Sequence, residues 1–331
     1  MLSLLALIYG KIVDLRNRLY DRGVFETFDL GARTISIGNI TTGGTGKTPL
    51  VAYVANILAE RGEKVCILTR GYGREDPQNR VLVSDGSQVL ASVREAGDEP
   101  FELAQKLIGK AIVIADADRV AAAEWAKRRF GVTAFVLDDG FQHRKAKRDL
   151  DIVCIDATSP FGSGEMLPAG RLREPLHNLD RADAIVITRS DLVKNVDNLR
   201  AQLAAILNPK AKIFAGKSAV TNVVPFLSDD KFNSKTPALP FCGIGNAESF
   251  YEGLHLAGIN VVDIMEFPDH HIYSQEDVKK IELKALSYHG EVLVTTAKDA
   301  VKLSNLTFEI PLYVVEIEMK LDDEGAFAAM L

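Results

Sequence analysis

The chain is organised around Gly38-Asn39-Ile40-Thr41-Thr42-Gly43-Gly44-Thr45-Gly46-Lys47-Thr48-Pro49. A short β-branched run at 34–37 precedes this stretch, and apolar residues at helical spacing follow it from Leu50 to Leu58. The sequence therefore predicts a glycine-rich turn that joins a buried strand to the start of a helix. Free backbone N–H groups at a helix start attract anions, and glycines let the chain approach them closely. We expect a phosphate-binding loop here.

This loop carries side chains suited to a nucleotide triphosphate and its metal ion. Lys47 is expected to reach the β- and γ-phosphates, and the Thr48 hydroxyl is expected to bind Mg²⁺. The residues expected to surround the phosphates with them are Thr42, Gly43, Gly44, Thr45 and Gly46. The loop departs from the G-x-x-x-x-G-K-[ST] pattern because Thr41 replaces the first glycine. The flanking strand and helix still favour a nucleotide site over a chance glycine-rich turn.

The composition indicates an ordinary globular chain with room for two domains. Its 331 residues are 47% hydrophobic and 25% charged. A net charge of −6 argues against a nucleic-acid partner. Cys66, Cys154 and Cys242 lie in apolar runs without metal-type spacing, which favours reduced thiols in a reducing compartment. No segment approaches the roughly 20 apolar residues that a membrane-spanning helix needs.

Residues 1–24 form an amphipathic segment of their own. Apolar residues from Leu2 to Leu19 are interrupted by charged ones such as Lys11 and Arg18. The apolar run is too short to span a bilayer, and no basic segment precedes it as in a signal peptide. The pattern fits a helix that lies in a membrane interface, and it fits equally a helix packed on the protein's own core. The residues alone leave both alternatives open.

Apolar strands alternate with helices over the first two thirds of the chain. Strands are expected at 65–69, 111–115, 134–137, 151–155, 184–188 and 212–215, and helices at 100–108 and 119–130. Such a pattern predicts an α/β fold with a mostly parallel sheet covered on both faces. Ligands of these sheets bind at the carboxyl ends of the strands. The motifs that follow the strands are therefore expected along one edge.

The composition changes at 216–240, where Gly, Asn, Asp and Pro are frequent and predict a connection. A second, smaller α/β unit is expected after it. Its strands are predicted at 239–242, 261–266, 292–295 and 312–317, and its helices at 248–257 and 275–288. Two α/β domains with a cleft between them is the simplest organisation.

Acidic residues follow one predicted strand and begin one predicted helix. Asp138 and Asp139 end the strand at 134–137, where a carboxylate can hold Mg²⁺ directly or through water. A merely solvated strand end is the alternative. Asp98 and Glu99 stand at a helix start, where acids also serve as ordinary first-turn residues. Because Asp98 is expected at the ligand edge of the sheet, the sequence supports a functional role for it as much as a helix-capping role.

Three further clusters could bind or process an anion. The loop 167–175 contains Arg171 and Arg173, which suits an anionic ligand. Asp269-His270-His271 follows a strand and offers a tunable base or a metal ligand. Lys298 follows the strand at 292–295 in the same way.

Taken together, these motifs closely resemble the tetraacyldisaccharide 4′-kinase family. The resemblance rests on Gly38-Asn39 with Gly43–Pro49, on 69–73, 97–100, 137–143, 148–152, 167–175, 267–271 and 298–303. It extends from the N-terminal helix to about residue 320. One motif alone would be weak, but this many in the same order are highly specific.

The resemblance implies an ATP- and Mg²⁺-dependent kinase that phosphorylates the 4′-hydroxyl of tetraacyldisaccharide 1-phosphate in lipid A biosynthesis. It implies a P-loop α/β/α sandwich over 25–218 and a smaller α/β domain over 219–321, with linker strands near 220–226 and 314–320 and a tail helix at 322–331. The N-terminal helix becomes an interfacial anchor. We expect a peripheral monomer on the cytoplasmic face of the bacterial inner membrane.

The resemblance also suggests roles for individual residues. Asp98 and His270 resemble a carboxylate–imidazole pair, with Asp98 as the candidate base, although Asp139 is the alternative proton acceptor. Asp138 and Asp139 fall on the metal side, and Arg171 falls near the transferred or substrate phosphate. The choice of His270 over its neighbour rests on the Asp-His motif alone. Ala297 stands where the family has Glu, so no role for that carboxylate is carried over.

The alternative is a nucleotide-switch GTPase or a metal-delivery ATPase. Glycine-crowded loops occur in those proteins, and Thr188-Arg189-Ser190-Asp191 faintly resembles a guanine-reading Asn-Lys-x-Asp. Position 188 lacks the Asn, however, and neither domain has the Cys/His cluster that metal delivery requires. A non-catalytic membrane scaffold would leave the ordered phosphate and metal motifs unexplained.

Overall fold

The computed structural model describes residues 2–226 and 230–331 of the chain, and these residues form two compact units. The first unit comprises Met1–Lys217 with Lys320–Leu331, and the second comprises Ser218–Met319. The chain passes between them in strands β8 (Lys212–Pro225) and β12 (Leu312–Leu321). Met1 and 227–229, which the sequence assigned to the N-terminal helix and to the connection, lie outside the described residues.

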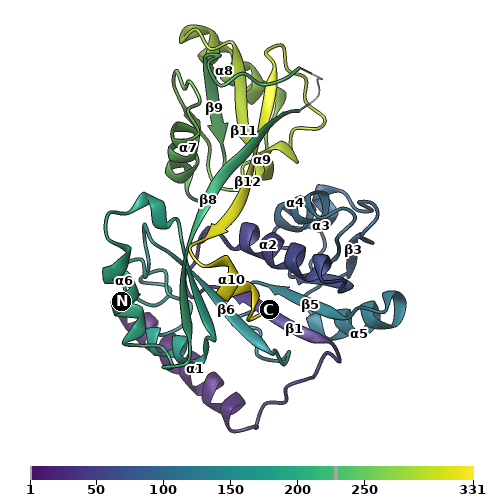
Figure 1. Ribbon diagram of the computed structural model, residues 1–331, viewed down its shortest axis with the longest axis vertical. Helices are drawn as coiled ribbons and strands as arrows, with labels where there is room; N and C mark the ends of the chain where they lie inside the picture. The colour runs from purple at the N-terminus through teal and green to yellow at the C-terminus, as the bar shows by residue number, and fades with distance from the viewer. Residues whose placement is uncertain (1, 227–229) are drawn as a thin grey trace. The chain divides into compact units, whose positions relative to one another are not determined.

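The first unit is built on a mostly parallel sheet, which confirms the predicted α/β class (Figure 1). Its strands are β1 (Arg33–Gly38), β2 (Val65–Thr69), β3 (Val81–Ser84), β4 (Ala111–Ala115), β5 (Ala134–Asp138), β6 (Leu150–Asp156), β7 (Ala184–Thr188) and the beginning of β8. They are ordered β8-β7-β6-β1-β5-β2-β4-β3. The edge strand β3 runs antiparallel to β4, and the neighbours from β8 to β4 in this order pair in parallel.

The helices of this unit follow the strands in sequence. They are α1 (Leu2–Asp21), α2 (Lys47–Glu60), α3 (Val93–Ala96), α4 (Asp98–Lys106), α5 (Arg119–Phe130), α6 (Val196–Ala204), α10 (Glu324–Ala328) and the 3₁₀ helices η1 (Leu176–Arg181) and η2 (Ser190–Leu192). Helix α2 buries Leu50, Val54 and Leu58 completely, four residues apart along one face. Helix α5 begins where the Asp118 carboxylate accepts hydrogen bonds from two first-turn amides.

The register of the central strands places the motifs at one edge. Ile37 of β1 lies opposite Asp138 of β5, and both strands are fully buried at this point. Gly38 follows, and a Cβ there would lie 2.6 Å from the backbone nitrogen of Phe141. Only glycine lets the two chain segments approach so closely. The glycine-rich loop after β1 therefore leaves the sheet beside the acids after β5.

The second unit is a smaller α/β layer with its own core. Its elements are β9 (Ala238–Cys242), α7 (Ala247–Leu256), β10 (Met265–Glu266), α8 (Gln275–Ser287), β11 (Val292–Thr296), α9 (Ala297–Ala300), β12 and the end of β8. The strand order is β10-β9-β11-β12-β8, and β10, β9, β11 and β12 pair in parallel. Phe241 and Leu293 of the sheet pack on Ile281 of α8, and all three are fully buried.

Two sequence expectations differ from the structure. The predicted strand 261–266 is wrong over most of its length, since only Met265–Glu266 pairs as a strand. Lys284 accounts for part of this difference. Its ammonium pairs with Asp263 and donates to the Ile264 carbonyl, which in a strand would accept a hydrogen bond from the neighbouring strand. The expected connection after 216 instead continues β8 as far as Pro225.

Candidate active site

The glycine-rich loop ends in the left-handed backbone that starts helix α2. Gly46 is the residue before the helix, with φ 74°, and it offers no side-chain cap to the first helical amides. Gly43 also has a positive φ, 103°, a conformation that side chains of L-residues rarely adopt. Uncapped amides at a helix start favour an anion. The loop thus has the backbone geometry of an anion site.

Three side chains hold the carbonyls of this loop. The Arg171 guanidinium donates two hydrogen bonds to the Thr42 carbonyl, at 3.0 and 2.6 Å. Arg189 donates to the Gly44 carbonyl at 2.8 Å. The buried hydroxyl of Thr188 donates to the carbonyl after Gly44, that of Thr45, at 2.9 Å. The strand end after β7 therefore contacts the loop itself, which disfavours the guanine-reading alternative for this segment.

Lys47, Asp139 and Arg173 form a charged group next to the loop. The guanidinium of Arg173 donates to both oxygens of the Asp139 carboxylate, each at 2.9 Å. The Lys47 ammonium lies 3.8 Å from the same carboxylate. Arg173 also donates to the side-chain oxygen of Asn39, whose amide group donates to the Thr45 hydroxyl. One arginine thus joins the acid after β5 to the loop after β1.

Asp138 and Asp139 are neighbours with opposite electrostatic behaviour. Burial raises the pKa of Asp138 to about 6, and the negative charges of Glu99 and Asp139 add to the effect. The Thr69 hydroxyl donates a hydrogen bond to the Asp138 carboxylate at 2.9 Å. Burial also acts on Asp139, but the charges of Lys47 and Arg173 outweigh it and hold its pKa below the usual value. For Asp138 burial outweighs the charge of Lys47, whereas for Asp139 the cations outweigh burial.

The donor set at this edge fits Mg²⁺. The hydroxyl of Thr48 and the carboxylate of Asp138 are hard oxygen ligands, and a divalent cation would relieve the buried negative charge of Asp138. Within the described part of the chain, no cluster of three or more His, Cys, Asp or Glu side chains is arranged as a metal site. Mg²⁺ at nucleotide sites takes only one or two carboxylates and completes its shell with phosphate and water.

Asp98 begins helix α4 in the same unit. The preceding Gly97 has φ 88°, and a Cβ there would lie 2.7 Å from the Tyr72 carbonyl. The loop after β2 and the start of α4 are therefore packed closely together. Glu99, next along the helix, is near enough to raise the pKa of Asp138. The structure thus brings the start of α4 to the edge that holds the acids after β5.

In the second unit the two adjacent histidines have different surroundings. His271 stacks on Phe267 with ring centroids 4.6 Å apart and contacts the Asp277 carboxylate at 3.3 Å. These contacts describe a packed structural imidazole. His270 has a positive φ of 61°, and its Nε2 lies 3.4 Å from the Lys298 ammonium, which also donates to Asp269. His270 thus lies beside a lysine and an aspartate, whereas His271 is packed against an aromatic ring.

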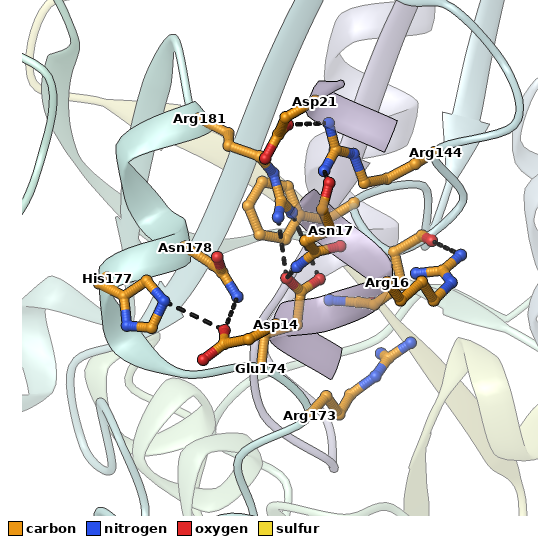
Figure 2. Close-up of polar contacts among 12 residues, drawn as sticks. Asp14, Arg16, Asn17, Asp21, Arg144, Arg173, Glu174, His177, Asn178 and Arg181 are labelled. Atoms are coloured by element: carbon orange, nitrogen blue, oxygen red, sulfur yellow. Dashed lines mark hydrogen bonds and ion pairs between the residues drawn. The ribbon is translucent and has the colours of Figure 1, made fainter. Parts of the chain in front are cut away.

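Helix α1 docks on the first unit through polar side chains (Figure 2). Asn17 is buried; its side-chain amide donates to Glu174 at 2.8 Å, and its carbonyl accepts from Arg144. Asp14 accepts from Asn178 and contacts the His177 ring. Glu174 is fully buried and also pairs with Arg181 of η1, as Figure 2 shows. Helix α1 is therefore hydrogen-bonded to the loop 167–175, which contains Arg173.

The opposite face of α1 is aliphatic and exposed. Leu4, Ile8, Ile12 and Leu15 follow helical spacing along one face, and each is about half exposed or more. The sequence left open whether this helix packs on the protein or faces a membrane. The structure shows that its polar side packs on the protein while its aliphatic side does not. Among residues 2–226 and 230–331, no helix combines the length and apolar character needed to cross a membrane.

Sequence reasoning did not find the contacts that assemble this site. Arg173 appeared only as one of two arginines in a loop, and Asn39 only as part of a motif. No spacing rule indicates that Arg173 pairs with Asp139, which lies 34 positions earlier in the chain. Arg189 and Thr188 carried a faint resemblance to a base-reading motif and instead bind the loop's carbonyls.

Fold and site together define a P-loop nucleotide-binding protein of the α/β class. A family model for tetraacyldisaccharide-1-P 4′-kinase matches residues 1–331. The chain belongs to this family, and it is a kinase.

Relatives agree with this assignment over nearly the whole chain. The tetraacyldisaccharide 4′-kinase of Halothermothrix orenii is 38% identical, covering 97% of this chain and 88% of its own. That of Geobacter metallireducens is 37% identical, covering 98% and 94%. A crystal structure of LpxK from Aquifex aeolicus in complex with ATP superposes with a TM-score of 0.78 at 31% identity, covering 98% of this chain and 96% of that one.

Proposed function

We propose that this chain transfers the γ-phosphate of ATP to the 4′-hydroxyl of a tetraacyldisaccharide 1-phosphate, a step of lipid A biosynthesis. The match of the entire chain to the kinase family carries the proposal. The anion geometry of the loop supports it, since phosphoryl transfer depends mainly on positioning and charge neutralisation.

In this proposal the loop amides and Lys47 hold the phosphates. The Lys47 ammonium has Asp139 as its neighbour at 3.8 Å, and Arg173 fixes that carboxylate from the other side. Lys47 is the first residue of α2, and in the proposal its ammonium meets the phosphates together with the loop amides. Mg²⁺, held by Thr48 and Asp138, would neutralise charge on the phosphate oxygens.

Asp98 is the proposed proton acceptor for the sugar hydroxyl. Asp139 is the weaker candidate, because Lys47 and Arg173 hold its pKa below the usual value and occupy both of its oxygens. A carboxylate so stabilised takes up a proton poorly. We retain the imidazole of His270 in the proposal as a functional group of the second unit, on the ground of the family resemblance.

Helix α1 is the proposed membrane contact. A helix whose polar side is bonded to the protein and whose aliphatic side is exposed suits the interface of a bilayer, where Lys11 and Arg18 can meet lipid phosphates. The acyl chains of the substrate would then remain in the membrane. We propose a monomer bound peripherally to the cytoplasmic face of the inner membrane.

The decisive experiment is a transfer assay with the full chain. Tetraacyldisaccharide 1-phosphate in mixed micelles is incubated with Mg²⁺ and γ-labelled ATP, and label is followed in the lipid and in free phosphate. We expect label in the lipid that depends on both ATP and Mg²⁺. Hydrolysis of ATP or GTP without lipid labelling would reject the kinase reaction and support the nucleotide-switch alternative.

A further inference from the structure

Three side chains outside the phosphate-binding loop donate hydrogen bonds to its backbone carbonyls. The Thr42, Gly44 and Thr45 carbonyls accept hydrogen bonds from Arg171, Arg189 and Thr188 respectively. The two arginines and the threonine come from two separate segments, the loop 167–175 and the end of β7.

These bonds fix the direction of the loop's amides. In a planar trans peptide the C=O and the next N–H point in opposite directions. A carbonyl held on one side by an arginine therefore sends the following N–H to the other side. The amides oriented in this way belong to Gly43, Thr45 and Gly46. In the part of the chain that the structure describes, none of these amides donates a hydrogen bond to a protein group.

The surroundings of the three donors indicate that they are built for this contact. Arg189 has a left-handed backbone with φ 53° and forms a largely buried ion pair with Asp156, so its guanidinium is fixed in place. Thr188 is fully buried. A Cβ at Gly43 would collide with the guanidinium of Arg171. Glycine at this position thus serves the approach of the arginine as well as the positive φ.

We propose that Arg171, Arg189 and Thr188 are positioning residues that hold the loop in its anion-binding shape before nucleotide arrives. The inference rests on the proposed nucleotide binding and assigns Arg171 a role different from direct contact with a phosphate. Its guanidinium acts through the Thr42 carbonyl, and the charge of the phosphates is met by Lys47 and the amides. Pre-organisation of this kind lowers the free-energy cost of ordering the loop when nucleotide binds.

The test compares hydrogen exchange of the loop without nucleotide and the affinity for ADP. The variants are Arg171→Met and Thr188→Val, which lack a donor, with Arg171→Lys and Thr188→Ser as conservative partners that keep one. Arg128→Met is the matched control, because Arg128 is 71% exposed on α5 and pairs there with Glu124. The Thr42 amide donates to the Arg171 carbonyl at 2.8 Å, so its exchange reports whether the loop stays docked on 167–175. We expect exchange of this amide to rise about fivefold or more and ADP to bind about tenfold more weakly, with partial recovery in the conservative partners.

Each other outcome decides against the proposal. Weaker ADP binding with unchanged exchange in the nucleotide-free protein would mean that Arg171 touches the phosphate directly. No change in either measurement would remove the positioning role. Should Thr188→Val fail to fold, the exposed Arg171 still provides both measurements. If the unaltered chain does not bind ADP, the proposed nucleotide site is wrong, while the exchange comparison still reports whether the side chains hold the loop.

Discussion

Arg173 and Asp139 form a two-point ion pair, with both guanidinium-to-carboxylate distances at 2.9 Å. The pair lies beside Lys47 and is bonded through Asn39 to the glycine-rich loop. An arginine fork fits a carboxylate in a way that a lysine does not. The contact thus sets the position of an acid, a lysine and a loop at once.

Replacing Arg173 by lysine tests this relationship. Arg173→Lys keeps the charge but loses the two-point contact and the bond to Asn39, so Asp139 becomes free to draw Lys47 away from the phosphates. We expect the turnover number to fall on the order of tenfold, while the midpoint of unfolding changes little. Steady-state kinetics with Mg²⁺-ATP and the lipid substrate measure this. A turnover equal to that of Arg128→Lys would show that charge alone suffices.

Asp98→Asn tests the proton acceptor. The amide cannot take up a proton, so we expect turnover to fall by roughly 10² to 10⁴, with ATP affinity within about twofold of the unaltered chain. Kinetics and calorimetric ATP titration give the two values. Equal losses in both, in a folded variant, would remove Asp98 from this role. The parallel variant Asp139→Asn should weaken nucleotide binding as well, because it releases Arg173 and Lys47.

The aliphatic face of α1 can be removed without touching the core. Changing Leu4, Ile8 and Ile12 to serine should weaken binding to vesicles that contain anionic lipid by about 100-fold, since each exposed side chain would lose an apolar environment. Vesicle co-sedimentation measures the loss. The same change at Leu283 and Leu286, exposed on α8, is the matched control. Unchanged vesicle binding would leave α1 without a lipid role.

His143 should make stability depend on pH. Burial, with the charges of Arg119 and Arg148, lowers the pKa of His143 to about 4, from an ordinary value near 6.5. Between these values the unfolded chain binds more protons than the folded one, so the free energy of unfolding falls as pH drops from 6.5 to 4. The contribution is about 3 kcal/mol.

Denaturant unfolding of His143→Gln and the unaltered chain at pH 7 and pH 4.5 measures this contribution. The variant should lose less stability over the interval. Asp138 acts with the opposite sign, because its raised pKa of about 6 favours the folded state at low pH. The comparison is therefore made between the two chains at each pH. Parallel losses in both would contradict the assignment to His143.

The sequence was informative where a local pattern determines structure. The alternation in β1, the crowded glycines and the spacing of Leu50, Val54 and Leu58 predict a strand, a turn and a helix, and the structure contains all three. It was uninformative where contacts join distant segments. Loop 167–175 has no periodicity, so nothing in it indicates that Arg173 meets Asp139 or that Glu174 meets α1. Only folding brings these residues together.

Glu174 and Arg173 are consecutive residues with contacts on opposite sides of one loop. Glu174 is bonded to Asn17 of α1, while Arg173 is bonded to Asp139. If α1 lies in the membrane interface as proposed, a single peptide unit, between Arg173 and Glu174, separates the contact to the membrane helix from the contact to Asp139. Weakening the contact between α1 and Glu174 should therefore lower the turnover number, even in detergent micelles, where the enzyme does not have to bind a bilayer. The enzyme would then work at full speed only while seated on its substrate's own membrane.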